Sequence, residues 1–291
     1  MNTTLKAGLW MIGAIVSFSS MAVAGREAGQ SLDTFEIMLF RSLVGLIIVA
    51  SVLSITGSWS QISRARLGTH VLRNIAHFTG QNLWFYALAL IPLAQVFALE
   101  FTTPLWVIVL APLVLGEALT RIKVFAAVIG FVGILVVARP SPETINLGVI
   151  TAASSAIFFA LTIMLTKRLT QTQGIGNILF WLTVIQLVLG LITAGYDGDI
   201  ALPSSAILPW LVIIGIAGLM AHFCFTNALA IAPATVVAPF DFARLPTITV
   251  VGVLLYNEAL DPWVAVGAVI ICGAIYLNIL SETRKNRVVA T

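Results

Sequence analysis

The chain has 291 residues, of which 59% are hydrophobic and only 9% are charged, and its formal net charge at pH 7 is +3. Soluble domains carry roughly 25% charged residues, so this chain has too little polar surface for a water-soluble globule. Its apolar residues come in long runs, which indicates a helical membrane protein; a β-barrel would instead show alternating segments of about ten residues. No basic patch is interleaved with aromatic residues, so a nucleic acid is not expected as a partner.

Ten apolar stretches predict ten transmembrane helices, because each is long enough to cross roughly 30 Å of hydrocarbon at about 1.5 Å per residue. The connections between them are short, and neither tail is long enough for a soluble domain. The expected fold class is therefore an all-α membrane protein. The expected spans are 5–24, 34–55, 72–91, 93–115, 122–139, 146–166, 176–195, 207–231, 233–256 and 262–280.

One sequence pattern occurs twice. A single shift of 141 in residue number (Glu258 minus Glu117) aligns Ala87–Leu119 with Ala228–Leu260 without a gap. We call this shift the repeat offset; it places Glu100 on Asp241. Because each copy holds five spans, an odd number, the second copy is expected to cross the membrane in the opposite direction. We therefore expect two inverted five-helix repeats, residues 1–140 and residues 141–291, with a binding site at their interface near the middle of the membrane.

The first span has two readings. Lys6, an apolar stretch and Ala22-Val23-Ala24 resemble a secretory signal with its cleavage site. Against this, the repeat offset places Phe18 on Phe159 and Arg26 on Lys167. The first and sixth spans are thus repeat partners, and cleavage would leave one copy a helix short. We expect the first span to be retained.

Lysine and arginine are distributed unequally between the loops of the two sides. Membrane proteins keep these residues mainly on the cytoplasmic side, so the bias predicts a multi-pass protein of the cell inner (cytoplasmic) membrane with both termini cytoplasmic. The opposite side then holds Arg26 and Arg139. The residues on the expected cytoplasmic side are Lys6, Arg64, Arg66, Arg121, Lys123, Lys167, Arg168, Arg284, Lys285 and Arg287.

Polar side chains in the second and third spans are candidates for a substrate path. Arg41 either points into a cavity, as a substrate contact, or extends outward towards Glu36. Arg73, His77 and Gln81 recur at four-residue spacing and therefore share one helical face, which Trp84 follows. The repeat offset places Gln81 on His222, so two polar stripes are expected to form a cavity wall. Arg73 is expected near the cytoplasmic interface, and the alternative role for His77 and His222 is a hydrogen bond between helices.

Charged residues also lie deep in the fourth and ninth spans, where each costs at least about 2.5–3.5 kcal/mol. Glu100, Asp241 and Arg244 are therefore candidate substrate contacts, and Glu100 or Asp241 is a candidate carrier of a coupling proton. The alternative is a structural ion pair, since Asp241 and Arg244 are three residues apart on one helical face. Pro104 predicts a bend that frees the carbonyl of Glu100 for a cation, an amine or a proton.

Other residues are expected to be structural. Gly130 with Gly133, and Gly215 with Gly218, are typical of close helix packing. Glu258 follows Asn257 at a helix end, where it is expected to fix the turn before the next helix. Cys224 and Cys272 lie in apolar runs, so free thiols are expected rather than a disulfide or a metal site.

Missing motifs narrow the class of function. The chain has no G-x-x-x-x-G-K-[ST] loop to bind ATP, no H-E-x-x-H or G-x-S-x-G sequence, and no cluster of metal ligands. No cofactor or metal is therefore expected, and the partners expected are a small-molecule substrate and the lipid bilayer, with a homodimer left open. A secondary transporter working by alternating access fits best. The alternative is an intramembrane enzyme or lipid-handling protein, which would combine His77 or His222 with a serine in a span.

The segments FSSMAVAGR, Arg41, and Pro104 followed by Gly116-Glu117 resemble the drug/metabolite transporter superfamily, in its ten-helix EamA-type branch. The resemblance covers nearly the whole chain. The stretches VLRNIAHFTGQNLWFYALALIPL and NEAL are similar to bacterial S-adenosylmethionine uptake carriers, from which the chain departs at Asp241-Phe242-Ala243-Arg244. The family includes carriers of amino acids, purines and vitamins such as riboflavin, so the resemblance implies transport of a small metabolite without naming it.

Overall fold

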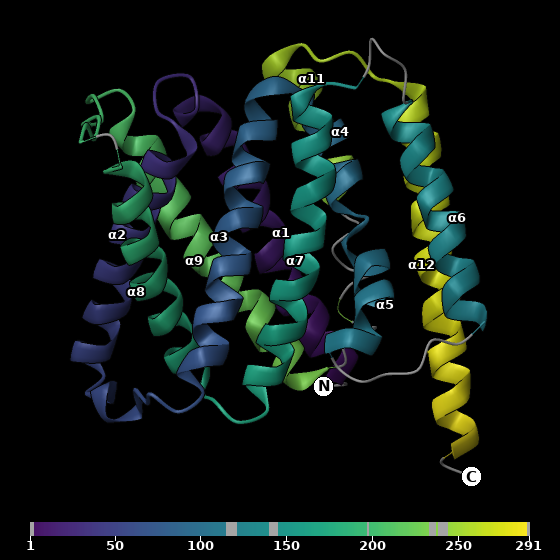
Figure 1. Cartoon of the computed structure of the whole chain (residues 1–291), viewed down its shortest axis with the longest axis horizontal. Coiled ribbons are helices and arrows are strands. Elements are labelled where there is room, and N and C mark those ends of the chain that lie inside the picture. The colour runs from purple at the N-terminus through teal and green to yellow at the C-terminus, as the bar shows by residue number, and fades with distance from the viewer. Residues whose placement is uncertain are drawn as a thin grey trace.

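The computed structural model describes residues 3–114, 121–139, 145–196, 198–232, 237 and 244–289. Within these ranges every regular element is a helix, which confirms the expected all-α fold class. The helices stand side by side in a bundle (Figure 1), and the first and last helices reach the same end of that bundle. Both chain ends therefore lie on one side.

The described helices lie within or around the expected spans, and the fourth span is divided into α4 and α5; of the ninth span, α11 covers residues 244–256, and most of the residues before Arg244 in that span lie outside the described ranges. The first half of the chain forms α1 (Thr3–Ala28), α2 (Thr34–Ile55), the short 3-10 helix η1 (Ser58–Gln61), α3 (Leu67–Leu90), α4 (Leu93–Glu100), α5 (Thr103–Val114) and α6 (Arg121–Ala138). The second half forms α7 (Leu147–Thr170), α8 (Ile175–Ala194), α9 (Leu208–Ile231), α11 (Arg244–Tyr256) and α12 (Pro262–Val289).

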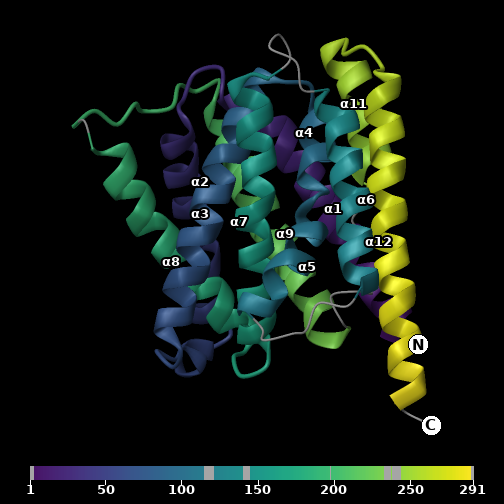
Figure 2. The same ribbon diagram turned by 45° about the vertical axis from the view of Figure 1, so that its right-hand side comes forward.

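The repeat seen in the sequence is also present in the helices. The repeat offset carries the starts of α2, α3, α5 and α6 onto the starts of α8, α9, α11 and α12. The packing is reciprocal as well, since α1 packs on α9 as its counterpart α7 packs on α3. Two helices pack on their own counterparts, α2 on α8 and α6 on α12, and these two pairs stand at opposite edges of the bundle (Figures 1 and 2). These helices of one repeat therefore pack on the other repeat as their counterparts do, which is expected when an approximate two-fold axis relates the two repeats.

The two repeats run in opposite directions. Arg26, in the last turn of α1, donates a hydrogen bond to the carbonyl of Leu88 near the end of α3. Gly148, in the first turn of α7, packs against Leu90 and Ile91 at that same end. The end of α1 and the beginning of its counterpart α7 therefore lie together, so the repeats are inverted as predicted.

The side chains are distributed as in a protein surrounded by lipid. Among the residues that the structure describes, six helical stretches are long and apolar enough to cross a membrane, and shorter apolar helices add to them. Helix α3 is not among the six because it carries a polar stripe, but that stripe faces inward: His70, Arg73, Asn74, His77, Gln81 and Asn82 are all buried. Its exposed residues include Val71, Leu72, Ile75 and Tyr86. A polar interior behind an apolar surface requires lipid around the helix.

Glycines allow the closest helix contacts. A Cβ at Gly267 of α12 would lie 2.8 Å from the carbonyl oxygen of Gly133 of α6. Gly215 and Gly218 of α9 pack against Val44 and Arg41 of α2. The expected packing role of Gly133, Gly215 and Gly218 is therefore confirmed, and Cys224 and Cys272 are free thiols, as expected.

Candidate functional site

A cavity of about 100 Å³ lies between the two repeats. It is lined by α1, α3 and the α4–α5 segment of the first repeat and by α7, α9 and α11 of the second. Its wall contains several pairs of residues related by the repeat offset: Phe18 with Phe159, Met21 with Thr162, Gln81 with His222, Trp84 with Phe225, and Thr103 with Arg244. The cavity therefore lies on the approximate two-fold axis.

Glu100 and Arg244 form an ion pair across the repeats. The Arg244 Nη2 atom donates to Glu100 Oε1 at 2.9 Å, and the Trp84 indole N–H donates to Glu100 Oε2 at 2.8 Å. The side chains of Arg244 and Glu100 are only 3% and 11% exposed. Phe18, Phe97 and Phe101 surround the guanidinium, at 4.8, 5.3 and 5.6 Å from its carbon to the ring centres. Such cation–π contacts further stabilise the buried charge.

The helix break next to Glu100 has a local cause. Pro104 lacks an N–H and clashes with the carbonyl four residues earlier, so α4 ends at Glu100 and α5 begins at Thr103. The expected bend is thus a complete interruption. The carbonyl of Glu100 is not left open, because the Thr103 hydroxyl donates to it at 2.6 Å. The carbonyl of Glu100 is therefore not free for a ligand, and the role of its carboxylate as a substrate contact stays a prediction.

His77 and His222 also meet across the repeats. Their Nε2 atoms are 3.1 Å apart and the ring centres are 4.6 Å apart, so one ring donates a hydrogen bond and the other accepts it. Phe18 packs edge-on against His222, and Phe159 packs against His77. This geometry is the hydrogen bond between helices that the sequence left as one alternative for the two histidines.

Arg73 and Gln81 line the same cavity from α3. Arg73 is only 2% exposed, and its expected position near the cytoplasmic interface stays a prediction. Its Nε atom donates to the Thr166 hydroxyl at 3.2 Å and its Nη1 atom donates to the Asn74 side-chain oxygen at 3.1 Å. Helix α7 covers this part of α3, which is why Arg73 is buried. The shared face of Arg73, His77 and Gln81 agrees with their spacing.

One of the described candidate residues, Arg41, is not brought to this cavity. Arg41 is buried against Gly218 and borders a separate small space with Gln186. It does not reach Glu36, which instead accepts hydrogen bonds from the backbone N–H groups of Asp33 and Ala201. Asp241 lies outside the described residues, so its role, like that of Arg41, stays a prediction.

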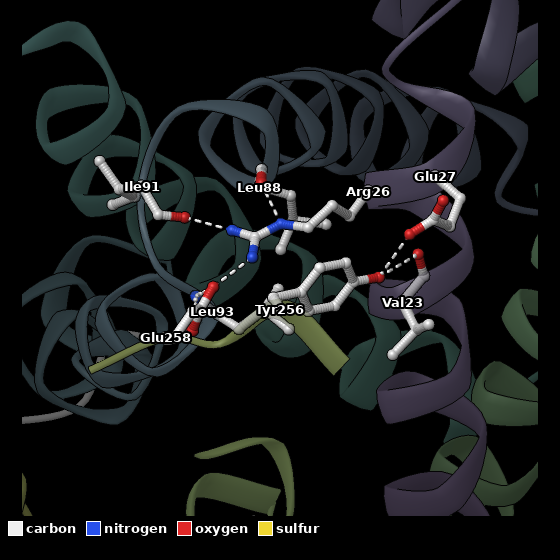
Figure 3. Close-up of polar contacts among 8 residues, drawn as sticks. All are labelled: Val23, Arg26, Glu27, Leu88, Ile91, Leu93, Tyr256 and Glu258. Carbon is white, nitrogen blue, oxygen red and sulfur yellow. Dashed lines mark hydrogen bonds and ion pairs between the residues drawn. The ribbon is translucent and has the colours of Figure 1, made fainter. Parts of the chain in front are cut away.

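A second polar group, which we call the end cluster, consists of Arg26, Glu27, Tyr256 and Glu258 (Figure 3). Arg26 pairs with Glu258 and donates to the carbonyls of Leu88 and Ile91. Glu258 also accepts from the Leu93 N–H at the start of α4, and the Tyr256 hydroxyl donates to Glu27 at 2.9 Å. The cluster thus fastens the end of α1 to the segment after α11.

The sequence did not predict this contact, since Glu258 was expected to fix the turn before α12. It instead stabilises the start of α4, in the other repeat. The sequence does contain a pattern that marks these positions. The repeat offset matches basic Arg26 with basic Lys167 and acidic Glu258 with acidic Glu117. Charges of the same sign at matched helix ends of both repeats indicate positions with a common structural role.

The profile of the EamA-like transporter family matches the chain twice, at residues 5–139 and 146–280. The chain belongs to the EamA-like transporter family. The first match to the EamA profile covers α1 from residue 5 through α6, and the second covers α7 through residue 280 of α12, so the cavity lies between two EamA units. Membership of this family agrees with the resemblance found in the sequence.

Proteins named as transporters are similar over almost the full chain. An S-adenosylmethionine uptake transporter of Rickettsia conorii is 27% identical over 98% of this chain and 97% of its own length. A riboflavin transporter of Vibrio cholerae is 27% identical over 97% of this chain and 96% of its own length. A solved crystal structure covers 96% of this chain and 98% of its own, with 18% identity and a TM-score of 0.67, which supports the fold.

Proposed function

We propose that this protein is a secondary transporter that carries a small metabolite across the cell inner membrane through the cavity between its two repeats. The observation that supports this most directly is the pairing of equivalent residues on the cavity wall, such as Phe18 with Phe159 and Gln81 with His222. Inverted-repeat transporters bind their cargo at the repeat interface, near the middle of the membrane. Residues 1–140 and 141–291 are then the two halves that move against each other.

The metabolite we propose contains a planar ring. Relatives of this chain are named for transport of S-adenosylmethionine and of riboflavin, and both compounds contain a fused heterocycle. The cavity wall offers aromatic faces at Phe18, Trp84, Phe159 and Phe225, which suit stacking on such a ring. Glu100, Arg244, Gln81, His77 and His222 supply polar contacts around it, with Asp241 and Arg41 as further candidates.

Alternating access would open the cavity to each side in turn. Pockets for small molecules usually enclose roughly 300–1,000 Å³. The cavity here has about 100 Å³, so binding requires the halves to separate. The charge bias of the loops favours cytoplasmic termini, which puts the end cluster on the outer side. We propose that the Arg26–Glu258 pair holds that side closed, and that protonation of Glu100, by releasing Arg244, couples a proton to transport.

Uptake into proteoliposomes tests this function. Radiolabelled S-adenosylmethionine and riboflavin are supplied in parallel, with and without an inward proton gradient. We expect saturable uptake of at least one of them by the unmodified protein and loss of that uptake in Glu100→Gln. Asp33→Asn is the matched control, because it makes the same acid-to-amide change at an exposed helix cap where asparagine serves equally well. Equal uptake by Glu100→Gln and the control would remove Glu100 from the mechanism.

The enzymatic alternative has less support. It requires a serine beside a histidine, and the residues described on the cavity wall include His77 and His222 but no serine. Their Nε2 atoms are engaged with each other. Product analysis of S-adenosylmethionine and riboflavin after incubation with the detergent-purified protein separates the two functions: chemical turnover without uptake would favour the enzyme.

A further inference from the structure

The cavity wall departs from two-fold symmetry at one end. Arg73 and His77 line the cavity from α3, but their counterparts in α9 under the repeat offset are Ile214 and Gly218, which do not. Ile214 is fully buried in the apolar core, and Gly218 lies against the Arg41 guanidinium. The shared residues therefore form a wall common to both repeats, while the cationic end of the cavity is supplied by one repeat alone.

Charge on the wall is also unbalanced at this end. Glu100 and Arg244 form an ion pair at the other end of the stripe. Arg73 has only the neutral partners Thr166 and Asn74, and within the described ranges no acidic side chain pairs with it. A buried guanidinium that lacks a counter-ion is costly, because burial removes the water that would otherwise solvate the charge. An anion entering the cavity would supply that counter-ion.

Hydrogen-bonding groups beside Arg73 are unused as well. The His77 Nδ1 atom and the Gln81 Oε1 atom are buried and have no hydrogen-bond partner, and both residues line the cavity. They lie one and two turns along α3 from Arg73. Buried polar atoms are nearly always satisfied in folded proteins, so two unsatisfied ones on a cavity wall point to a ligand. A ring N–H of His77 can donate to an anionic oxygen, whereas the Gln81 carbonyl oxygen accepts from a donor group elsewhere on the ligand.

We propose that the Arg73 end of the cavity binds an anionic group of the substrate, a carboxylate or a phosphate, while the aromatic wall holds its planar ring. The proposal rests on the transport function proposed above and narrows its substrate class. The guanidinium fork matches the two oxygens of either anion. From Arg73 to Trp84 the stripe runs about 16 Å along α3, at 1.5 Å per residue, which is long enough for a ring and an anionic group to bind together.

Paired compounds that differ only in the anionic group test this proposal. S-adenosylmethionine is compared with its decarboxylated form, and riboflavin 5′-phosphate with riboflavin, as competitors for binding and as substrates in proteoliposomes. We expect the unmodified protein to prefer the member that carries the carboxylate or phosphate in at least one pair, by about tenfold or more. The first pair reports a carboxylate site and the second a phosphate site.

Variants of Arg73 test whether this residue causes the preference for compounds with a carboxylate or phosphate. Arg73→Gln is expected to reduce binding of the compound with the anionic group to the level of the partner that lacks it, without weakening that partner, and Arg73→Lys to restore part of the preference. Melting temperatures without ligand show whether each variant is folded, because Arg73 also bonds Thr166 of α7. Equal transport of both members of each pair, or a preference that survives in folded Arg73→Gln, overturns the anionic site. Absence of uptake of all four compounds counts instead against the proposed cargo and transport.

Discussion

Arg26 and Lys167, which the repeat offset matches, make the same contact in the two repeats. Arg26 Nε donates to the carbonyl of Leu88 at 2.8 Å, and Lys167 Nζ donates to the carbonyl of Leu229, also at 2.8 Å. Leu88 and Leu229 are themselves repeat counterparts. Because the repeats are inverted, these contacts lie at opposite ends of the bundle. At the Arg26 end, the bond to Glu258 adds a link between the repeats.

That link leads to a prediction about access to the cavity. Glu258→Gln removes the charge of the pair and weakens the contact to Leu93, so the outer end should open more often. With Thr103→Cys on the cavity wall and both native cysteines replaced, we expect severalfold faster labelling from outside the cell by a membrane-impermeant maleimide. Asp261→Asn is the control, since its pair with Arg139 is far more exposed and exposed pairs contribute only about 0–1 kcal/mol. Labelling rates that do not change in Glu258→Gln contradict a closing role.

The buried Glu100–Arg244 pair predicts strong coupling between two substitutions. Removal of one partner from a buried pair costs about 3–5 kcal/mol, because the remaining charge loses the attraction of this partner. Glu100→Gln and Arg244→Gln should each lower the melting temperature, and the double variant should recover much of that loss. Uptake is expected to stay low in all three, since both groups are proposed substrate contacts. Additive losses of stability in the double variant would show that the two side chains act independently.

The histidine pair predicts different results for two replacements of His222. Its repeat counterpart is Gln81, and a glutamine at position 222 can still bond to His77 Nε2. We expect His222→Gln to keep most of the uptake and stability, while His222→Ala loses about 1–3 kcal/mol because His77 is left unsatisfied. Uptake by His222→Gln, measured from about pH 5.5 to about 8, tests whether the histidine pair is a structural hydrogen bond or a proton relay. If uptake by folded His222→Gln no longer depends on pH, the pair is a proton relay instead.

The contact between α6 and α12 predicts a stability effect of a single methyl group. Gly267→Ala places a Cβ 2.8 Å from the Gly133 carbonyl oxygen and 3.1 Å from the Val137 nitrogen, and backbone atoms of a packed helix cannot move aside easily. We expect a loss of about 1–3 kcal/mol, visible as a lower melting temperature. Gly273→Ala is the matched control on α12, since no atom lies within 4 Å of its added Cβ. Similar melting temperatures for both variants would show that the helices separate freely here.

Helix positions and the inverted repeat could be predicted from the sequence because hydrophobic runs and a constant offset report them directly. The start of α2 at Thr34 was expected at 34, and α9 (Leu208–Ile231) was expected over 207–231. The common face of His77 and Gln81 also followed from spacing.

Side-chain partners across the repeats could not be predicted in this way. Glu100 and Arg244 are far apart in the chain, and no local pattern specifies their ion pair. The burial of Arg73 was not predicted, because its place along α3 is visible in the sequence whereas the cover provided by α7 is not. Partner choice depends on how the two repeats pack, which a single sequence leaves open.

Gly218 marks a position at which the two halves of the chain differ in the space that a side chain can occupy. Its counterpart is His77, and a Cβ at Gly218 would lie 2.7 Å from Arg41 Nε, so the arginine of α2 fills the space that an imidazole would need. The halves are therefore no longer interchangeable. A chimera built from two copies of the first half would bring a second histidine against Arg41, and it could assemble only after that arginine had been exchanged for a smaller residue.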